Sequence, residues 1–113
     1  MHESSLAQSV VQVAESTARQ HGGTHVSAIT LEIGVLAGVE IEELRLCFDT
    51  ASRASIAKGA ALIIERPGGR AWCMSCGESV LLSSLVEPCP RCGCHRLQVT
   101  AGDQFSVLEI EID

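Results

Sequence analysis

The sequence has no tyrosine and only 2 Phe and 1 Trp, so it offers little material for stacking nucleic-acid bases. Its 14 acidic side chains outnumber 8 basic ones, and this balance argues against neutralisation of nucleic-acid phosphates. No apolar stretch approaches the ~18 residues of a membrane span. The first residues lack the basic and apolar regions of a signal peptide. We therefore predict a cytoplasmic protein with neither nucleic acid nor membrane as partner.

Catalytic motifs are lacking as well. The sequence contains no glycine-rich phosphate loop after a strand, no nucleophile elbow and no HExxH motif. None of its acidic residues is singled out as a catalytic pair. The sequence therefore predicts a protein that is not an enzyme.

The feature that most needs explaining is the presence of 6 cysteines. Thiols persist in a reducing cytosol and disulfides are rare there, so metal ligation is the favoured use. In each CxxC pair a tight turn directs both thiolates at one ion, and a glycine follows each pair, where left-handed φ suits the turn. Four thiolates fit structural Zn²⁺ better than iron. The two pairs, separated by twelve residues, are Cys73 with Cys76 and Cys89 with Cys92.

The two cysteines outside these pairs, Cys94 and Cys47, are interpreted differently. Cys94 and His95 follow the second pair and its glycine, and they are either alternative ligands, redox-sensitive neighbours or plain surface groups. Cys47 lies on a predicted helix, where we expect a small core residue.

Hydrophobic periodicity predicts two helices and three strands. Apolar residues at three- and four-residue spacing indicate helices over 4–20 and 40–55. Ser4 or Ser5 is expected to cap the first helix and Gly22-Gly23 to end it. Two-residue alternation indicates strands over 29–35, 60–66 and 105–112, the first two parallel and the last antiparallel to the second. The expected helical core stripe is Leu6, Val10, Val13, Ala14 and Ala18, and the last strand contributes Leu108, Ile110 and Ile112.

These elements predict an α+β fold. A small mixed three-stranded sheet with two helices would form one domain from residues 1–69 and 97–113. A four-cysteine, zinc-ribbon-like module would be inserted as a second domain over 70–96, because that segment holds most of the cysteines and little apolar sequence.

The extreme N-terminus is a second candidate metal site. A free α-amine on Met1, the amide nitrogen of His2 and its imidazole can chelate one ion through fused rings. Such nitrogen donors impose a square-planar field, which suits Ni(II) or Cu(II). The carboxylate of Glu3 would complete or tune the site. Taken alone, a histidine at position 2 also fits an ordinary solvated terminus.

Several segments occur in a characteristic order: Met1-His2-Glu3-Ser4-Ser5-Leu6, Leu31-Glu32-Ile33-Gly34, Gly38-Val39-Glu40, the two CxxC pairs and Glu109-Ile110-Glu111. Together they resemble the HypA/HybF family of nickel-incorporation proteins for hydrogenase maturation. This resemblance implies a nickel domain of two helices on a small mixed sheet, with an inserted zinc domain.

The resemblance also implies roles and partners. Met1 through its amine, His2 and Glu3 would carry Ni(II) as cargo, with Glu40 near that site. The four paired cysteines would hold Zn(II). The implied partners are a HypB-type GTPase and a [NiFe]-hydrogenase large-subunit precursor, and the chain would be a monomer or weak homodimer.

Two alternatives stay open. One is a zinc-ribbon interaction or nucleic-acid-binding module without a nickel role, against which the charge and the scarce aromatics count. The other is a thiol redox enzyme using CxxC, which fails if all four thiolates close around zinc.

Overall fold

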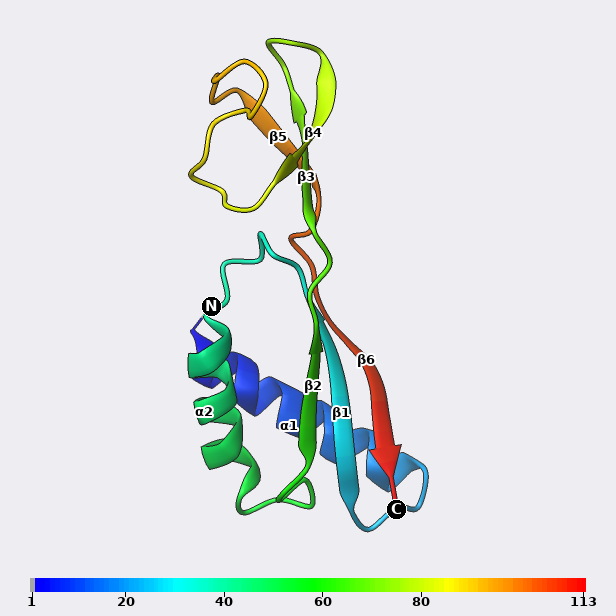
Figure 1. Cartoon of the computed structure of the whole chain (residues 1–113). Helices are drawn as coiled ribbons and strands as arrows, with labels where there is room; N and C mark the ends of the chain where they lie inside the picture. The colour runs from blue at the N-terminus through cyan, green and yellow to red at the C-terminus, as the bar shows by residue number, and fades with distance from the viewer. Residues whose placement is uncertain (1) are drawn as a thin grey trace. The chain divides into compact units, whose positions relative to one another are not determined.

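The computed structural model describes residues 2–113, which form two helices and six strands (Figure 1). None of the helices in this range is long and apolar enough to cross a membrane. Strands β2, β1 and β6 form one sheet with β1 in the centre, and β4, β3 and β5 form another with β3 in the centre. In chain order the elements are α1 (Glu3–Gln20), β1 (Val26–Ile33), α2 (Ile41–Ser52), β2 (Ala61–Glu65), β3 (Gly69–Cys73), β4 (Glu78–Leu82), β5 (Leu97–Ala101) and β6 (Phe105–Ile112).

The α+β class with two helices is confirmed, and the chain divides into two compact units. The helical unit comprises the chain up to Leu31, together with Val39–Ile64 and Val107–Asp113. The cysteine unit comprises Glu32–Gly38 and Glu65–Ser106. The division expected from the sequence, into a zinc-binding domain over 70–96 and a domain from residues 1–69 and 97–113, stays a prediction.

Helix α1 begins and ends by different means. His2 is its N-cap residue in an extended conformation and makes no side-chain cap, so the expected cap by Ser4 or Ser5 is wrong. The helix starts at Glu3. The carboxylate of Glu3 lies in the first turn, where its negative charge interacts favourably with the positive end of the helix dipole. The predicted ending is confirmed, because Gly22 adopts φ 70° and the N–H of Gly23 donates to the Ala18 carbonyl at 2.8 Å.

Strand β1 is the centre of the first sheet and of the helical unit's core. β1 and β2 run in the same direction and β6 runs opposite to both, as the sequence predicted (Figure 1). The helices α1 and α2 pack against each other. The fully buried aliphatic side chains of β1 in this unit are Val26, Ile29 and Leu31; buried side chains of the helices are Ala7, Val10, Val11, Ala14, Ala18, Leu44 and Phe48.

Two residues expected in this core are exposed. Val13 of α1 is 45% exposed and Leu108 of β6 is 49% exposed. Periodicity places them on the apolar face of their own elements, but no neighbouring element within residues 2–113 covers them. The expectation of a core role was wrong for both.

The second sheet contains strands that the sequence pattern did not reveal. β3 pairs antiparallel with both β4 and β5. Its inward residues are Gly69, Ala71 and Cys73, which are small and only weakly apolar. Burial therefore alternates along β3 with a two-residue period, but the hydrophobicity of its residues hardly does. The core of this unit is Leu36, Ala71, Cys73, Val80, Leu82 and Cys89.

Two glycines let backbones meet closely inside the cysteine unit. Gly34 is buried, and a Cβ built on it would overlap the carbonyl group of Gly102. That same carbonyl accepts a hydrogen bond from the N–H of Leu36 at 2.7 Å. Because the obstacle is hydrogen-bonded backbone rather than a flexible side chain, it cannot move aside cheaply.

We expect Gly34→Ala to lower the free energy of unfolding by about 2 kcal/mol or more, because the added methyl collides with backbone. Urea denaturation of the metal-loaded protein measures this. Gly68→Ala is the matched control, since a Cβ there meets no atom within 4 Å and its φ is not positive. An equal loss in both variants would contradict the packing argument.

Candidate metal centres

The structure brings together the four thiols that the sequence paired. Their sulfur atoms all lie within 4.8 Å of one another. The Sγ atoms of Cys73 and Cys92 are 3.6 Å apart, and those of Cys76 and Cys89 are 3.9 Å apart. Sulfurs at about 2.3 Å from a tetrahedral zinc ion stand about 3.8 Å from each other. The donor set and its spacing therefore fit zinc.

Each CxxC pair is shaped by a tight backbone turn. The N–H of Gly77 donates to the Cys73 carbonyl, and the N–H of Gly93 donates to the Cys89 carbonyl, both at 2.9 Å. The two glycines adopt φ 66° and 74°, which confirms the left-handed conformation expected after each pair. The first cysteine of each pair is buried and also belongs to the core of the unit.

Electrostatics in the cluster favour a bound cation. The backbone N–H of Cys76 donates to the Cys73 sulfur at 3.5 Å and lowers the pKa of that thiol to about 7. The hydrogen bond to Cys73 raises the pKa of Cys76 to about 12. One thiolate thus forms readily and opposes ionisation of its neighbour. A divalent cation would remove this conflict by neutralising the thiolates.

Cys94 lies outside the four-thiol group. Its Sγ accepts a hydrogen bond from the Ser75 hydroxyl at 2.9 Å and another from the Arg96 N–H at 3.3 Å. These donors, the hydroxyl first, lower the pKa of the Cys94 thiol. His95 is exposed. Sequence reasoning missed Ser75, which lies inside the first CxxC pair and donates to Cys94, two residues after the second pair.

Cys47 is not the core residue that the sequence predicted. It lies partly exposed on α2, and its thiol donates to the Glu43 carboxylate at a sulfur–oxygen distance of 3.8 Å. Partial burial, followed by the charge of Glu43, raises the pKa of this thiol. The buried face of the helix runs through Leu44 and Phe48 instead.

We expect an alkylating reagent to modify Cys47 and Cys94 but spare the other four thiols in zinc-loaded protein, because metal-bound thiolates are closed to attack. Mass spectrometry after iodoacetamide treatment counts the modified sites. After chelation and mild unfolding, all six should react. Modification of any of the four clustered thiols in loaded protein would contradict a closed four-cysteine site.

The start of the chain forms the second candidate centre. Oε2 of Glu3 accepts a hydrogen bond from the backbone N–H of Glu40 at 3.1 Å, which links the first turn of α1 to the N-cap of α2. His2 is exposed and its carbonyl accepts the first helical hydrogen bond, from Leu6, at 3.1 Å. Met1, the third residue predicted for this centre, lies outside the described residues.

The bond to the Glu40 N–H is the main reason why the pKa of the Glu3 carboxyl is lowered. This shift adds stability above the carboxyl's ordinary pKa, and that stability is lost as pH falls through the lowered value. At neutral pH the carboxylate is ionised and docked. The sequence singled out Glu40 for its acidic side chain, whereas in the structure the backbone N–H of Glu40 makes the contact with Glu3. The free N–H groups at the start of a helix were the signal that could have indicated this.

Comparison with known proteins gives a consistent family match. Residues 1–112 match the family described as hydrogenase/urease nickel incorporation, metallochaperone, hypA. The hydrogenase maturation factor HypA of Azotobacter vinelandii is 48% identical over 113 residues, which is 100% of both chains. The protein of that name from Dechloromonas aromatica is 46% identical over the same full length.

Solved structures agree at the level of the fold. The solution structure of the Ni metallochaperone HypA from Helicobacter pylori matches with a TM-score of 0.69 and 21% identity. The match covers 99% of this chain and 97% of that one. A second solution structure, of a HypA protein, gives a TM-score of 0.68 at 22% identity, over 99% of this chain and 96% of the other. At these identities the likeness concerns the fold alone.

Proposed function

Because the chain belongs to the HypA family of hydrogenase and urease nickel-incorporation metallochaperones, we propose that it binds Ni(II) at its N-terminus and delivers it to a [NiFe]-hydrogenase precursor. The observation that carries the proposal is the docked first turn of α1. The carboxylate of Glu3 accepts a hydrogen bond from the Glu40 N–H, and this contact anchors the chain at the residue directly after His2. The proposed donors are the Met1 amine, the His2 amide nitrogen and the His2 imidazole.

The position of His2 at the N-cap suits this chemistry. The first N–H groups of a helix have no intrahelical acceptor. Deprotonating the His2 amide to bind Ni(II) therefore breaks no helical hydrogen bond. The imidazole is exposed and can reach cargo that arrives from solvent. Because bound Ni(II) needs neutral imidazole and deprotonated nitrogens, its affinity falls as pH decreases.

Glu3 and Glu40 have different parts in the proposal. Glu3 docks the first turn of α1 and adds negative charge beside the cargo. Its Oε2 atom already accepts the hydrogen bond from Glu40, so Glu3 tunes the site and does not bind Ni(II) through that oxygen. The first turn of α2 adds the acidic side chains of Glu42 and Glu43. This acidic surface raises the local concentration of cations and favours their capture.

The four-cysteine cluster has a structural role in the proposal. Zn(II) held by Cys73, Cys76, Cys89 and Cys92 supplies folding energy to a unit whose core is small. Two of these thiols are also core residues, so the metal and the apolar side chains stabilise the same centre.

The partners in the proposal follow from the family. Ni(II) is exchanged with a HypB-type GTPase and passed to the hydrogenase large-subunit precursor in the cytoplasm. The chain works as a carrier rather than an enzyme and acts as a monomer or weak homodimer. The alternative, a zinc-ribbon interaction or nucleic-acid module without a nickel role, predicts no nickel binding that depends on the first residues.

We expect His2→Ala to weaken Ni(II) binding at least about 100-fold, because loss of a metal ligand typically costs more than the 10–100-fold of a supporting residue. Isothermal calorimetry on untagged, zinc-loaded protein measures this. His21→Ala is the matched control, since His21 is also exposed but lies at the other end of α1.

An N-terminal Gly-Ser extension of the chain should abolish tight Ni(II) binding as well, because it removes the α-amine from its place beside His2. Wild-type affinity in either the extended protein or His2→Ala would overturn the site and favour the zinc-ribbon alternative.

Two substitutions at Glu3 separate docking from ligation. Glu3→Gln retains a carbonyl oxygen that accepts from the Glu40 N–H, so we expect Ni(II) affinity within about threefold of wild type. Glu3→Ala loses the hydrogen bond, and we expect about tenfold weaker binding. Calorimetry gives both values, with the Glu40 amide signal in NMR reporting docking. If Glu3→Gln lost as much affinity as Glu3→Ala, the carboxylate would be a ligand instead.

A further inference from the structure

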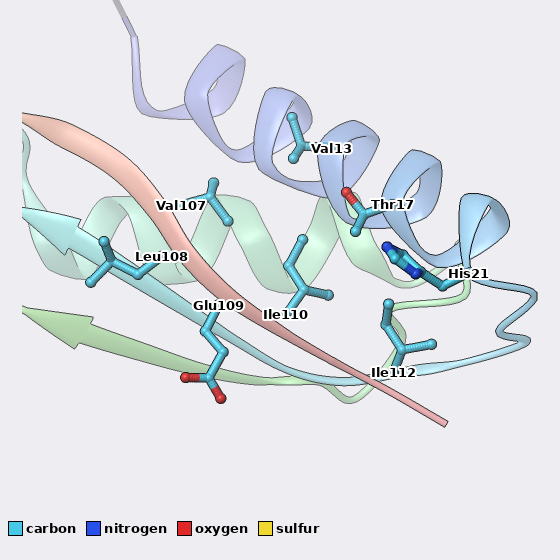
Figure 2. Close-up of a pocket in the computed structure, with 8 residues that line it drawn as sticks. All are labelled: Val13, Thr17, His21, Val107, Leu108, Glu109, Ile110 and Ile112. Atoms are coloured by element: carbon cyan, nitrogen blue, oxygen red, sulfur yellow. The ribbon is translucent and has the colours of Figure 1, made fainter.

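An apolar groove in the helical unit is lined by none of the residues assigned to the two candidate metal centres. It has a volume of about 450 Å³ and lies between α1 and β6. Figure 2 shows Ile110 and Ile112 pointing toward α1, while Glu109 points away on the opposite side of the strand. The groove is lined by Val13, Thr17, His21, Val107, Leu108, Glu109, Ile110 and Ile112.

The groove runs beside an open sheet edge. β6 pairs with β1 and is the last strand on its side of the sheet. The N–H and carbonyl of Asp113 bond to the chain beside β1, and the Glu111 carbonyl accepts from the Ser27 hydroxyl of β1. Backbone groups of successive residues point to opposite edges of a strand. The polar backbone groups of Ile110 and Ile112 therefore face outward, next to the groove.

We propose that this edge binds an extended segment of a partner protein that adds a fourth strand beside β6, with apolar and basic residues in alternation. One face of the added strand would contact the exposed side chains of Val13 and Leu108. Its other face would meet the exposed carboxylates of Glu109 and Glu111. Opposite charges on neighbouring strands stabilise the pair, and no Lys or Arg among the described residues lines the groove.

The same charges disfavour a second copy of this chain as the occupant. A symmetric antiparallel pair of β6 strands in which both Ile110 and Ile112 hydrogen-bond to the partner strand is centred at residue 109, 110 or 111. Each of these registers sets acidic residues opposite acidic residues: Glu109 against Glu109, Glu109 against Glu111, or Glu109 against Asp113. Like charges directly opposite are destabilising. A basic partner segment avoids this repulsion.

The test uses a fluorescent seven-residue peptide that alternates lysine and valine, and a matched peptide that alternates glutamate and valine. We expect the lysine peptide to bind the full-length, metal-loaded protein at least about tenfold more tightly in an anisotropy titration. N-methylation of alternate backbone nitrogens in the lysine peptide should abolish binding, because it removes the strand's hydrogen-bond donors.

Variants locate the binding surface. Glu109→Lys with Glu111→Lys should lose the lysine peptide and gain the glutamate peptide. The matched control, Glu42→Lys with Glu43→Lys, makes the same charge change on α2 and should bind the lysine peptide within about threefold of wild type. His2→Ala should bind it as wild type does, so a failure of the nickel proposal leaves this result intact.

Hydrogen exchange gives an independent readout that does not depend on variants. The amides of Ile110 and Ile112 should exchange rapidly in the free protein and become protected by the lysine peptide. The proposal is overturned by equal binding of the two charged peptides or by undiminished binding of the N-methylated one. Protection of these amides without peptide, together with a dimer in sedimentation velocity, would identify a second copy as the occupant and also overturn it.

Discussion

Burial of β1 is the constraint on which the helical unit depends. With few aromatic residues available, the unit must build its core from aliphatic side chains, and β1 supplies three that are fully buried. As the central strand of β2-β1-β6, it also uses both of its hydrogen-bonding edges. The packed helices α1 and α2 complete the unit. The Glu3–Glu40 hydrogen bond ties the first turn of α1 to the N-cap of α2, next to His2 of the proposed nickel site.

The sequence predicted the parts of the fold that have a clear hydrophobic period. Helices α1 and α2 and strands β1, β2 and β6 all lie within a few residues of their expected places. It missed β3, because Gly69, Ala71 and Cys73 alternate in size and burial but hardly in hydrophobicity. It also placed Val13 in the core, since periodicity identifies an apolar face but not whether another element covers that face.

The candidate sites were predictable to different degrees. The CxxC spacing was enough to group the four thiols, because a tight turn brings both members of a pair together locally. The contact between Glu3 and Glu40 joins residues 37 positions apart through backbone, and only the fold brings these two together. Cys94 was left open by the sequence, and its partner Ser75 became visible only once the two CxxC turns were placed side by side.

The double membership of Cys73 and Cys89, as metal-cluster thiols and as core residues, has a consequence for the life of the protein in a cell. If zinc fills the cluster, a chain made during zinc shortage lacks the ion that holds two of its core residues together, so its core is weakened. Incompletely folded chains are removed by proteases. The abundance of the carrier would then follow zinc supply, so that a scarcity of one metal limits the traffic of another.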